Sequence, residues 1–300
     1  MEETTVNFWK GAPPRKSKSA VADCLRWNKK PWICNRCGAA ATEEYAQALE
    51  ECPACPFPTG NLGAPSTFHR RRLLVMSLGD ILDPQAPIEW FAQGLDTIRK
   101  CNQMNFLLPS KWPQLWRSRM SSALDFAKSN GSEELCHFLR CWDNGSPENG
   151  FIIPQNIWFG VSVENQQCVN ERSPLLLKIP AKIRFLSVEP LLGPVELPQP
   201  MDGEEKHWLD WVIVGGESGP GARPCNVEWI QSIIRQCKEA GIPCFVKQPG
   251  SSPRCDLRQP IGEWPLGVQF PNTPHVNDKK GGDPLEWPED LRIQQFPNRK

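Results

Sequence analysis

The central part of the chain alternates short apolar runs with longer amphipathic stretches. Six apolar runs predict buried strands, at residues 72–78, 104–108, 156–163, 182–188, 211–214 and 243–246. Apolar residues at helical spacing predict helices at 87–101, 111–129, 133–141, 164–177 and 227–240, with Gly241 ending the last. This alternation implies a parallel sheet with helices outside it. We therefore expect an α/β fold, a partial or closed (β/α) barrel, with a doubly wound open sheet as the alternative.

Composition narrows the class of protein. Of 300 residues, 39% are hydrophobic and 23% charged, which is typical of a globular chain. No apolar run reaches the ~18 residues of a membrane span, and the N-terminus lacks the apolar core of a secretory signal. Lys+Arg and Asp+Glu both total 34, which excludes a wholly basic protein that coats nucleic acid but leaves room for a local basic patch. The 13 cysteines, without a secretion signal, indicate a reducing cytoplasm with some thiols as metal ligands.

Polar groups follow every predicted strand. In parallel α/β proteins the carboxyl ends of the strands form one rim, where ligands bind. The residues at this rim are Ser77, Gly79 and Asp80; Ser110 and Lys111; Ser162 and Glu164; Ser187 and Glu189; Gly215, Gly216, Glu217 and Ser218; and Lys247 and Gln248. We expect a ligand site here, with Asp80, Lys111, Glu164, Glu189, Glu217 and Lys247 as candidate catalytic residues. The alternative is that these residues are ordinary solvated loop starts.

A glycine-rich loop, VGGESGPGARP at residues 214–224, is the strongest loop signal. Its glycines allow close approach of a ligand to backbone N–H groups, and Arg223 can hold an anion through two hydrogen bonds. The candidate ligand-binding residues are Gly215, Gly216, Ser218, Gly219 and Arg223. The spacing matches neither the Walker A motif nor GxGxxG. The alternative is a tight turn in which Glu217 and Arg223 pair with each other.

Four cysteines have the spacing of a metal site. Cys34 and Cys37 form one CxxC pair, Cys52 and Cys55 a second, and 14 residues separate the pairs. This spacing favours a structural zinc ion held by four thiolates. An iron–sulfur cluster and unliganded cysteines are the alternatives. The nine other cysteines have no paired spacing and are expected to be small buried side chains.

The chain thus divides into four predicted parts: a basic N-terminal arm (1–30), a zinc-ribbon insertion (31–58), the barrel (59–250) and a Pro-rich C-terminal tail of loops with one short helix (251–300). Residues 1–72 hold eleven Lys/Arg and seven Asp/Glu, an excess of +4 (11 − 7). A solvated surface explains these charges, and contact of the ribbon and arm with DNA or RNA is the second interpretation.

Long segments resemble one known family. They are NIWFGVSVENQ, IRFLSVEPLLGPVEL, LDWVIVGGESGPGARP and GIPCFVKQPG, with LLVMSLGDILD, FLLPSKWP and the tail KGGDPLEWPEDLRIQQFP. From about residue 72 to 297 the chain resembles the phage gene-product-thirty-seven/sixty-eight family, found in phages and bacteria. At residues 110–113 it has Ser-Lys-Trp-Pro, where the family usually has a block of the type Thr-Lys-Arg-Pro.

The resemblance implies a radical-SAM-like partial barrel. Members of that family carry an N-terminal three-cysteine block that suggests a [4Fe–4S] cluster and S-adenosylmethionine as cofactors. Here the block is missing: Cys24 alone does not replace it, and the ribbon cysteines have another spacing. We therefore expect these cofactors only if a missing N-terminal segment or a partner chain supplies the cluster; otherwise the member is degenerate.

Two hypotheses follow for a phage or prophage protein in the cytoplasm of its bacterial host. In the first, the chain is an enzyme or former enzyme whose rim binds a small molecule, with carboxylates for polar or cationic groups and with Lys247 and Arg223 for anions. In the second, the ribbon and arm bind nucleic acid or a host protein, and the barrel is a scaffold.

Overall fold

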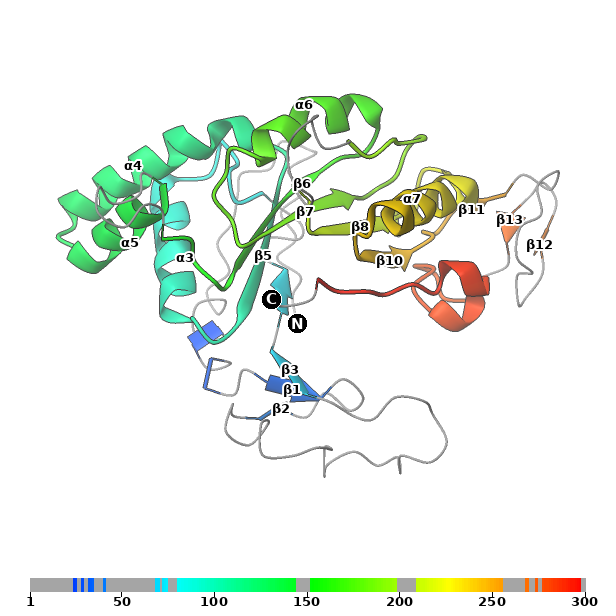
Figure 1. Ribbon diagram of the computed structural model, residues 1–300, viewed down its shortest axis with the longest axis horizontal. Coiled ribbons are helices and arrows are strands. Elements are labelled where there is room, and N and C mark those ends of the chain that lie inside the picture. Colours follow the sequence, from blue (N-terminus) through cyan, green and yellow to red (C-terminus); the bar gives the residue numbers. More distant parts are fainter. Residues whose placement is uncertain are drawn as a thin grey trace. The chain divides into compact units, whose positions relative to one another are not determined.

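The structure analysed is a computed structural model (Figure 1). It describes residues 80–143, 152–198, 209–255 and 277–297, together with short segments at 24–25, 28–29, 32–34, 40–41, 68–70, 72–74, 268–269 and 273–274. Within this part of the chain, no helix is both long and apolar enough to cross a membrane.

Six strands join in one sheet in the order β10 (Cys244–Gln248), β8 (Trp211–Gly215), β7 (Ile183–Val188), β6 (Ile157–Ser162), β5 (Asn105–Ser110) and β4 (Arg72–Leu74). The pairs β4–β5, β7–β8 and β8–β10 are parallel. These are the six strands expected from the apolar runs, so the predicted α/β class with a parallel sheet is confirmed. The order follows the sequence, without the reversal that marks the switch point of a doubly wound sheet.

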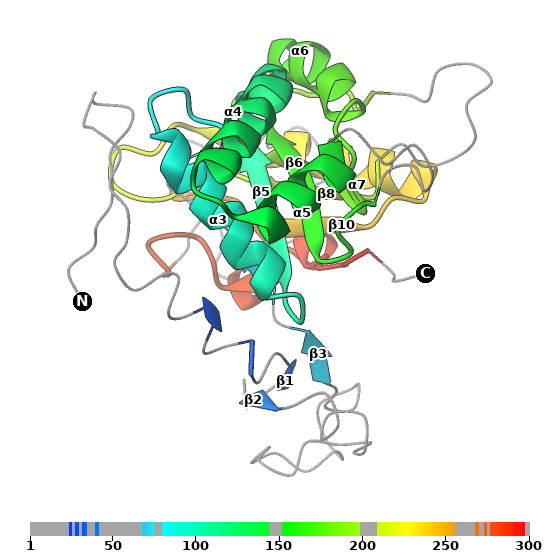
Figure 2. The ribbon, with the colours of Figure 1, turned by 90° about the vertical axis from the view of Figure 1, so that its left-hand side faces the viewer.

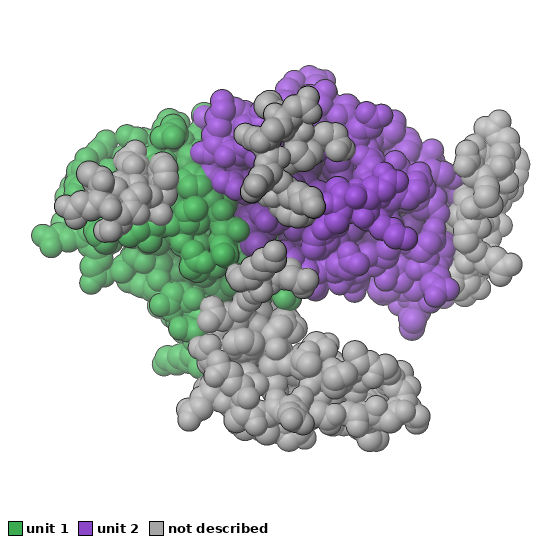
Figure 3. Space-filling model, viewed as in Figure 1, with its two compact units in different colours: residues 1–108, 115–158, 180–182 green, residues 109–114, 159–179, 183–300 purple. Residues whose placement is uncertain are grey.

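The chain forms two compact units (Figure 3). Unit 1 comprises residues 1–108, 115–158 and 180–182. Its helices α3 (Ile88–Lys100), α4 (Trp116–Ser129) and α5 (Glu133–Asp143) pack against one another (Figure 2). The rings of Trp116 and Trp142 meet edge to face at 4.9 Å between centroids, and the Trp142 indole N–H donates to the carbonyl of Pro180 at 2.6 Å. Large buried aromatic side chains therefore stabilise this helical cluster.

The start predicted for the second helix, residue 111, is wrong. Residues Pro113–Leu115 form a 3₁₀ turn, η2, and α4 begins only at Trp116. The residue before a proline is disfavoured in the α conformation, so Pro113 prevents a helix from starting at Lys111. This delay leaves Lys111 and Trp112 in the loop that follows β5.

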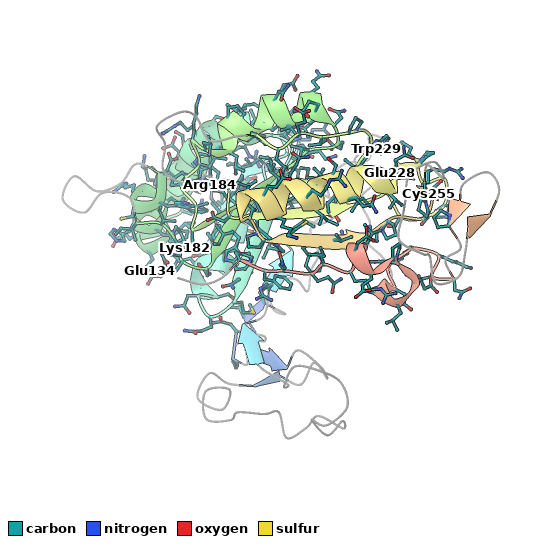
Figure 4. The ribbon with its side chains drawn as sticks, turned by 45° about the vertical axis from the view of Figure 1, so that its right-hand side comes forward. Glu134, Lys182, Arg184, Glu228, Trp229 and Cys255 are labelled. Carbon is teal, nitrogen blue, oxygen red and sulfur yellow. The ribbon has the colours of Figure 1, made fainter. Side chains whose placement is uncertain are left out.

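Unit 2 comprises residues 109–114, 159–179 and 183–300. Helix α6 (Gln166–Leu176) begins where the Asn165 side chain accepts a hydrogen bond from the Cys168 N–H at 3.0 Å. Helix α7 (Val227–Ala240) packs on β8 and β10 through a buried face, and it ends at Gly241 with φ +67°, as predicted. Figure 4 shows Glu228 and Trp229 in the first turn of α7.

Residues 277–297 of the C-terminal tail pack into unit 2, and they contain more regular structure than the one short helix predicted. They form two 3₁₀ helices, η3 (Pro284–Glu286) and η4 (Glu289–Leu291), and Trp287 between them is fully buried. Beyond them the chain runs along β10, where Val246 N–H donates to Ile293 at 2.8 Å and Gln295 N–H donates to Cys244 at 2.9 Å. The tail therefore covers the open edge of β10.

The remaining strands are short. β1 (Trp32–Cys34), β2 (Ala40–Ala41) and β3 (Phe68–Arg70) form an antiparallel sheet, β9 (Cys225–Asn226) pairs with β11 (Pro253–Arg254), and β12 (Val268–Gln269) pairs with β13 (Thr273–Pro274). Of the predicted zinc ligands, Cys34 is described through its backbone in β1, while Cys37, Cys52 and Cys55 lie outside the described residues.

Two glycines let three loops of unit 2 touch through their backbones. Gly250 has φ +90°, and a Cβ there would lie 2.6 Å from the carbonyl oxygen of Glu217. Gly281 has φ +66°, and a Cβ there would collide with the Gly250 carbonyl. The glycine-rich loop, the loop after β10 and the C-terminal tail therefore meet where no side chain fits.

We predict that G250A and G281A each destabilise the protein by about 1–3 kcal/mol, because alanine adds both a clash and an unfavourable positive φ. The measurement is the urea midpoint at constant slope. G94A is the control: Gly94 lies inside α3 with no neighbour within 4 Å of the added Cβ, so this substitution should stabilise by up to about 1 kcal/mol. Equal midpoints for G281A and wild type would contradict the close contact.

Candidate strand-end site

Six of the charged rim residues predicted from the sequence lie in unit 2: Lys111, Glu164, Glu189, Glu217, Arg223 and Lys247. Backbone hydrogen bonds of 2.9 Å connect the ends of β6, β7 and β8, from Val163 to Ser187, from Leu192 to Glu164 and from Leu191 to Gly215. The structure therefore brings these strand ends together, as the parallel sheet requires.

Asp80, the remaining candidate catalytic residue, lies in unit 1. It is 7% exposed, and its Oδ1 accepts a hydrogen bond from the Leu82 N–H at 2.8 Å. Its carboxylate thus stabilises the turn after β4. Ser77 and Gly79, predicted beside it, lie outside the described residues.

Glu164 is held between two cations. Lys111 Nζ lies 2.6 Å from its Oε1, and Arg172 Nη1 donates to its Oε2 at 2.8 Å. Arg172 also donates to the carbonyl of Ser162 at 2.6 Å, which attaches α6 to the end of β6. Burial raises the pKa of Glu164, but the hydrogen bond and charge of Lys111 and the charge of Arg172 outweigh it, so the pKa lies below its ordinary value. Glu164 is therefore a fixed anion.

Glu189 has the opposite environment. Its side chain is 15% exposed and packs against Gly215, where a Cβ would come within 2.9 Å of Oε1. Its Oε2 accepts from Lys247 Nζ at 3.2 Å and lies 3.5 Å from the Ser187 hydroxyl, whereas Oε1 is buried and makes no hydrogen bond. Burial raises the pKa of Glu189 above its ordinary value, and Lys247 and Ser187 offset this only in part.

Glu217 and Arg223 pair within the glycine-rich loop. Arg223 donates from Nε to Glu217 Oε2 at 2.7 Å and from Nη2 to Oε1 at 3.1 Å. The hydrogen bonds from Arg223 lower the pKa of Glu217. This pair is the one that the turn interpretation expects. The Arg223 side chain remains 56% exposed, and the charge of Glu164 also acts on it, which places both groups in one electrostatic environment.

The glycines predicted to bind a ligand are themselves in contact with protein. Gly216 N–H donates to the carbonyl of Gln248 at 2.9 Å, and a Cβ at Gly216 would collide with the carbonyl of Pro249. Gly219, with φ +104°, donates its N–H to the Ser251 hydroxyl at 2.8 Å. At Gly216 the loop after β10, rather than a ligand, approaches the backbone closely. The roles of Gly215, Gly216, Ser218 and Gly219 toward a ligand stay predictions.

Arg172 was not expected from the sequence. Its only signal is a position eight residues after Glu164, and Glu164 precedes the helix, so helical spacing does not pair the two. With Arg172, the described residues of the unit 2 rim include four cations (Lys111, Arg172, Arg223 and Lys247) and three carboxylates (Glu164, Glu189 and Glu217). These residues therefore carry one positive charge in excess when all are ionised, and two when Glu189 is protonated.

A separate cavity lies in unit 1. It has a volume of about 350 Å³, and Phe138, Cys141 and Ile152 contribute to its wall. At its edge the Arg99 guanidinium lies 2.8 Å from Glu134 Oε2, and His137 Nε2 lies 3.6 Å from Cys141 Sγ. None of the residues predicted for the rim lines this cavity, and its strongest charges pair with each other. The rim of unit 2 remains the stronger candidate site.

The other cysteines mostly fit the prediction of small buried side chains. Seven are buried (Cys101, Cys136, Cys141, Cys225, Cys237, Cys244 and Cys255), and Cys24 and Cys168 are partly exposed. Within the described ranges, no three side chains of the types His, Cys, Asp and Glu are grouped to hold a metal ion.

A family model matches residues 5–286, and its description reads "Protein of unknown function (DUF5131)". The chain belongs to this family. The match includes every residue of the unit 2 rim and the four cysteines of the predicted ribbon. No curated protein and no solved structure matches the chain.

We predict opposite pH dependences for E189Q and E164Q. The pKa of Glu189 is raised, so its contribution to stability is present below its unfolded pKa and is lost as the pH rises through the folded pKa. E189Q should therefore gain stability relative to wild type as the pH rises from about 4 to 8.

The pKa of Glu164 is lowered, so its contribution to stability is present above its unfolded pKa and is lost as the pH falls through the folded pKa. E164Q should be about 1–3 kcal/mol less stable at pH 7, with the gap closing in acid.

Urea midpoints of both variants across this pH range check the prediction. A constant difference between E189Q and wild type would contradict the raised pKa of Glu189.

Proposed function

We propose that the unit 2 rim binds a small anionic ligand and exchanges a proton with it, as the active site of a partial (β/α) barrel. The observation that carries the proposal is the pair of neighbouring carboxylates with opposite environments. Glu164, between Lys111 and Arg172, stays ionised. Glu189, with one buried oxygen that makes no hydrogen bond, has a raised pKa and so keeps its proton to higher pH than Glu164 does. Carboxyl groups whose pKa values diverge in this way serve as acid and base in enzymes.

The charge of the rim supports an anion rather than a cation as ligand. Lys247 is 45% exposed and Arg223 is 56% exposed, so both heads are accessible from solvent while they pair with carboxylates. An entering anion can share these cations, and the positive excess of the described rim residues offsets part of its charge. An anion bound to Lys247 would lie close to Glu189, because Lys247 Nζ is 3.2 Å from Glu189 Oε2.

The sequential strand order supports the barrel, because each strand of the six-stranded sheet lies beside the next strand of that sheet along the chain. The family resemblance supports a phage or prophage origin and the cytoplasm of a bacterial host. It also points to radical-SAM chemistry, but two buried cysteines, Cys101 and Cys225, do not fit as ligands of a [4Fe–4S] cluster. Burial raises the pKa of Cys225 to about 12, and burial with the charge of Cys24 raises that of Cys101 to about 11, so both stay thiols. We derive no step through that cluster.

The four-cysteine cluster is a second proposal, a structural zinc ion held by Cys34, Cys37, Cys52 and Cys55. It rests on the CxxC spacing, and three of these residues lie outside the described part of the chain. A ribbon that holds zinc also suits the alternative function, contact of the ribbon and basic arm with nucleic acid or a host protein.

We predict about one zinc and no iron per chain when the protein is purified without oxygen and analysed by elemental analysis and visible absorbance. The double substitution C52S/C55S should remove the zinc, whereas C168S, at a half-buried cysteine outside the cluster, should keep it. Iron with sulfide and a brown colour would refute zinc and would make S-adenosylmethionine cleavage the next assay.

We predict that inorganic phosphate binds the rim and that K247A weakens this binding about tenfold, because one charge-assisted hydrogen bond is lost. Isothermal titration calorimetry measures the affinity. K238A is the matched control, since Lys238 is an exposed lysine in the last turn of α7. Phosphate binding that K247A and K238A weaken equally would refute a specific anion site.

A further inference from the structure

An exposed tryptophan stands at the same rim. Trp112 follows Lys111 in the loop after β5, within unit 2, and is 40% exposed. Among the tryptophans whose side chains the structure describes, it is the one classed as an exposed large hydrophobic residue, while Trp116, Trp142 and Trp158 are at most 3% exposed. Trp112 is therefore a partly exposed aromatic residue that directly follows a cation of the rim in the chain.

The backbone at Trp112 is tightly held. Its N–H donates to the Ser110 hydroxyl at 2.9 Å, and the next residue, Pro113, is buried and begins η2. On the other side, Lys111 is fixed by its 2.6 Å ion pair with Glu164. A preorganised loop loses little conformational entropy when a ligand binds. An exposed indole presents a flat π-face on which planar rings stack, with an affinity that tolerates many ring types.

We propose that the ligand of this rim is a nucleoside phosphate, whose base stacks on Trp112 and whose phosphate lies among Lys111, Lys247 and Arg223. The inference rests on the proposed anion site and adds a second contact, the stacking of an aromatic ring of the ligand on Trp112. It requires a ligand with a planar heterocycle and an anion in one molecule, and a mononucleotide is the simplest. Single-stranded nucleic acid has the same two parts, but among the described rim residues the excess is one positive charge, which suits one phosphate group better than a phosphate backbone.

The test compares three probes by isothermal titration calorimetry: guanosine 5′-monophosphate, ribose 5-phosphate and guanosine. For wild type, the nucleotide should bind about tenfold more tightly than ribose 5-phosphate, because stacking adds to the phosphate contacts. W112A should reduce nucleotide affinity to that of ribose 5-phosphate and leave ribose 5-phosphate binding unchanged. W112F, which keeps an aromatic face, should retain most of the advantage.

W229A is the control, because Trp229 is a partly exposed tryptophan on α7 (Figure 4), and it should bind all probes like wild type. Nucleotide and ribose 5-phosphate binding equally in wild type would overturn the stacking inference and leave the anion site intact. Failure of both phosphates to bind would overturn both proposals. We would also test a twelve-nucleotide single strand. If it binds over a hundredfold more tightly than the nucleotide and its affinity falls steeply with salt, the ligand of the rim is nucleic acid and the proposal of a mononucleotide is wrong.

Discussion

Charged groups at the ends of a buried sheet are costly unless they are paired, and this constraint organises the unit 2 rim. Strands β6, β7 and β8 are almost entirely apolar inside the sheet, and each one is followed within two residues by a glutamate. Each glutamate is paired with at least one cation. The two pairs of Glu164 connect the loop after β5 with helix α6, the pair of Glu189 reaches strand β10, and the pair of Glu217 lies within the glycine-rich loop. The ion pairs therefore define the site and also hold the loops in place.

Glu164 and Glu189 have different numbers of cationic partners, and this difference is what would allow the rim to transfer a proton. Glu164 has two cations on its two oxygens, whereas Glu189 has one lysine on one oxygen and none on the other. Neighbouring strands thus present one carboxyl that stays ionised and one that retains its proton more readily. An anion that draws Lys247 away from Glu189 raises the proton affinity of that carboxyl, because the charge of Lys247 is the main influence opposing its burial.

Close backbone contacts between loops stabilise the region around the rim. Gly250 and Gly281 let the glycine-rich loop, the loop after β10 and the tail touch without side chains between them. Ser251 extends the contact, since its hydroxyl accepts from Gly219 and donates to the carbonyl of Lys279 at 2.6 Å. Many glycines of this region thus serve loop packing, which explains why the motif differs from the known phosphate-binding loops.

Local patterns were sufficient to predict the six strands, the C-cap at Gly241 and the rim glutamates, because apolar periodicity reports burial and the carboxyl ends of parallel strands share one edge. The partners of those glutamates required the folded chain: neither Arg172 beside Glu164 nor the inequality of Glu164 and Glu189 is visible in any spacing. The packing of the tail also required the folded chain. Its Pro-rich sequence does not indicate that Trp287 is buried in the core or that residues 293–295 lie along the edge of β10. Such contacts join residues far apart in the chain, and their geometry depends on how the loops close, which a local pattern does not encode.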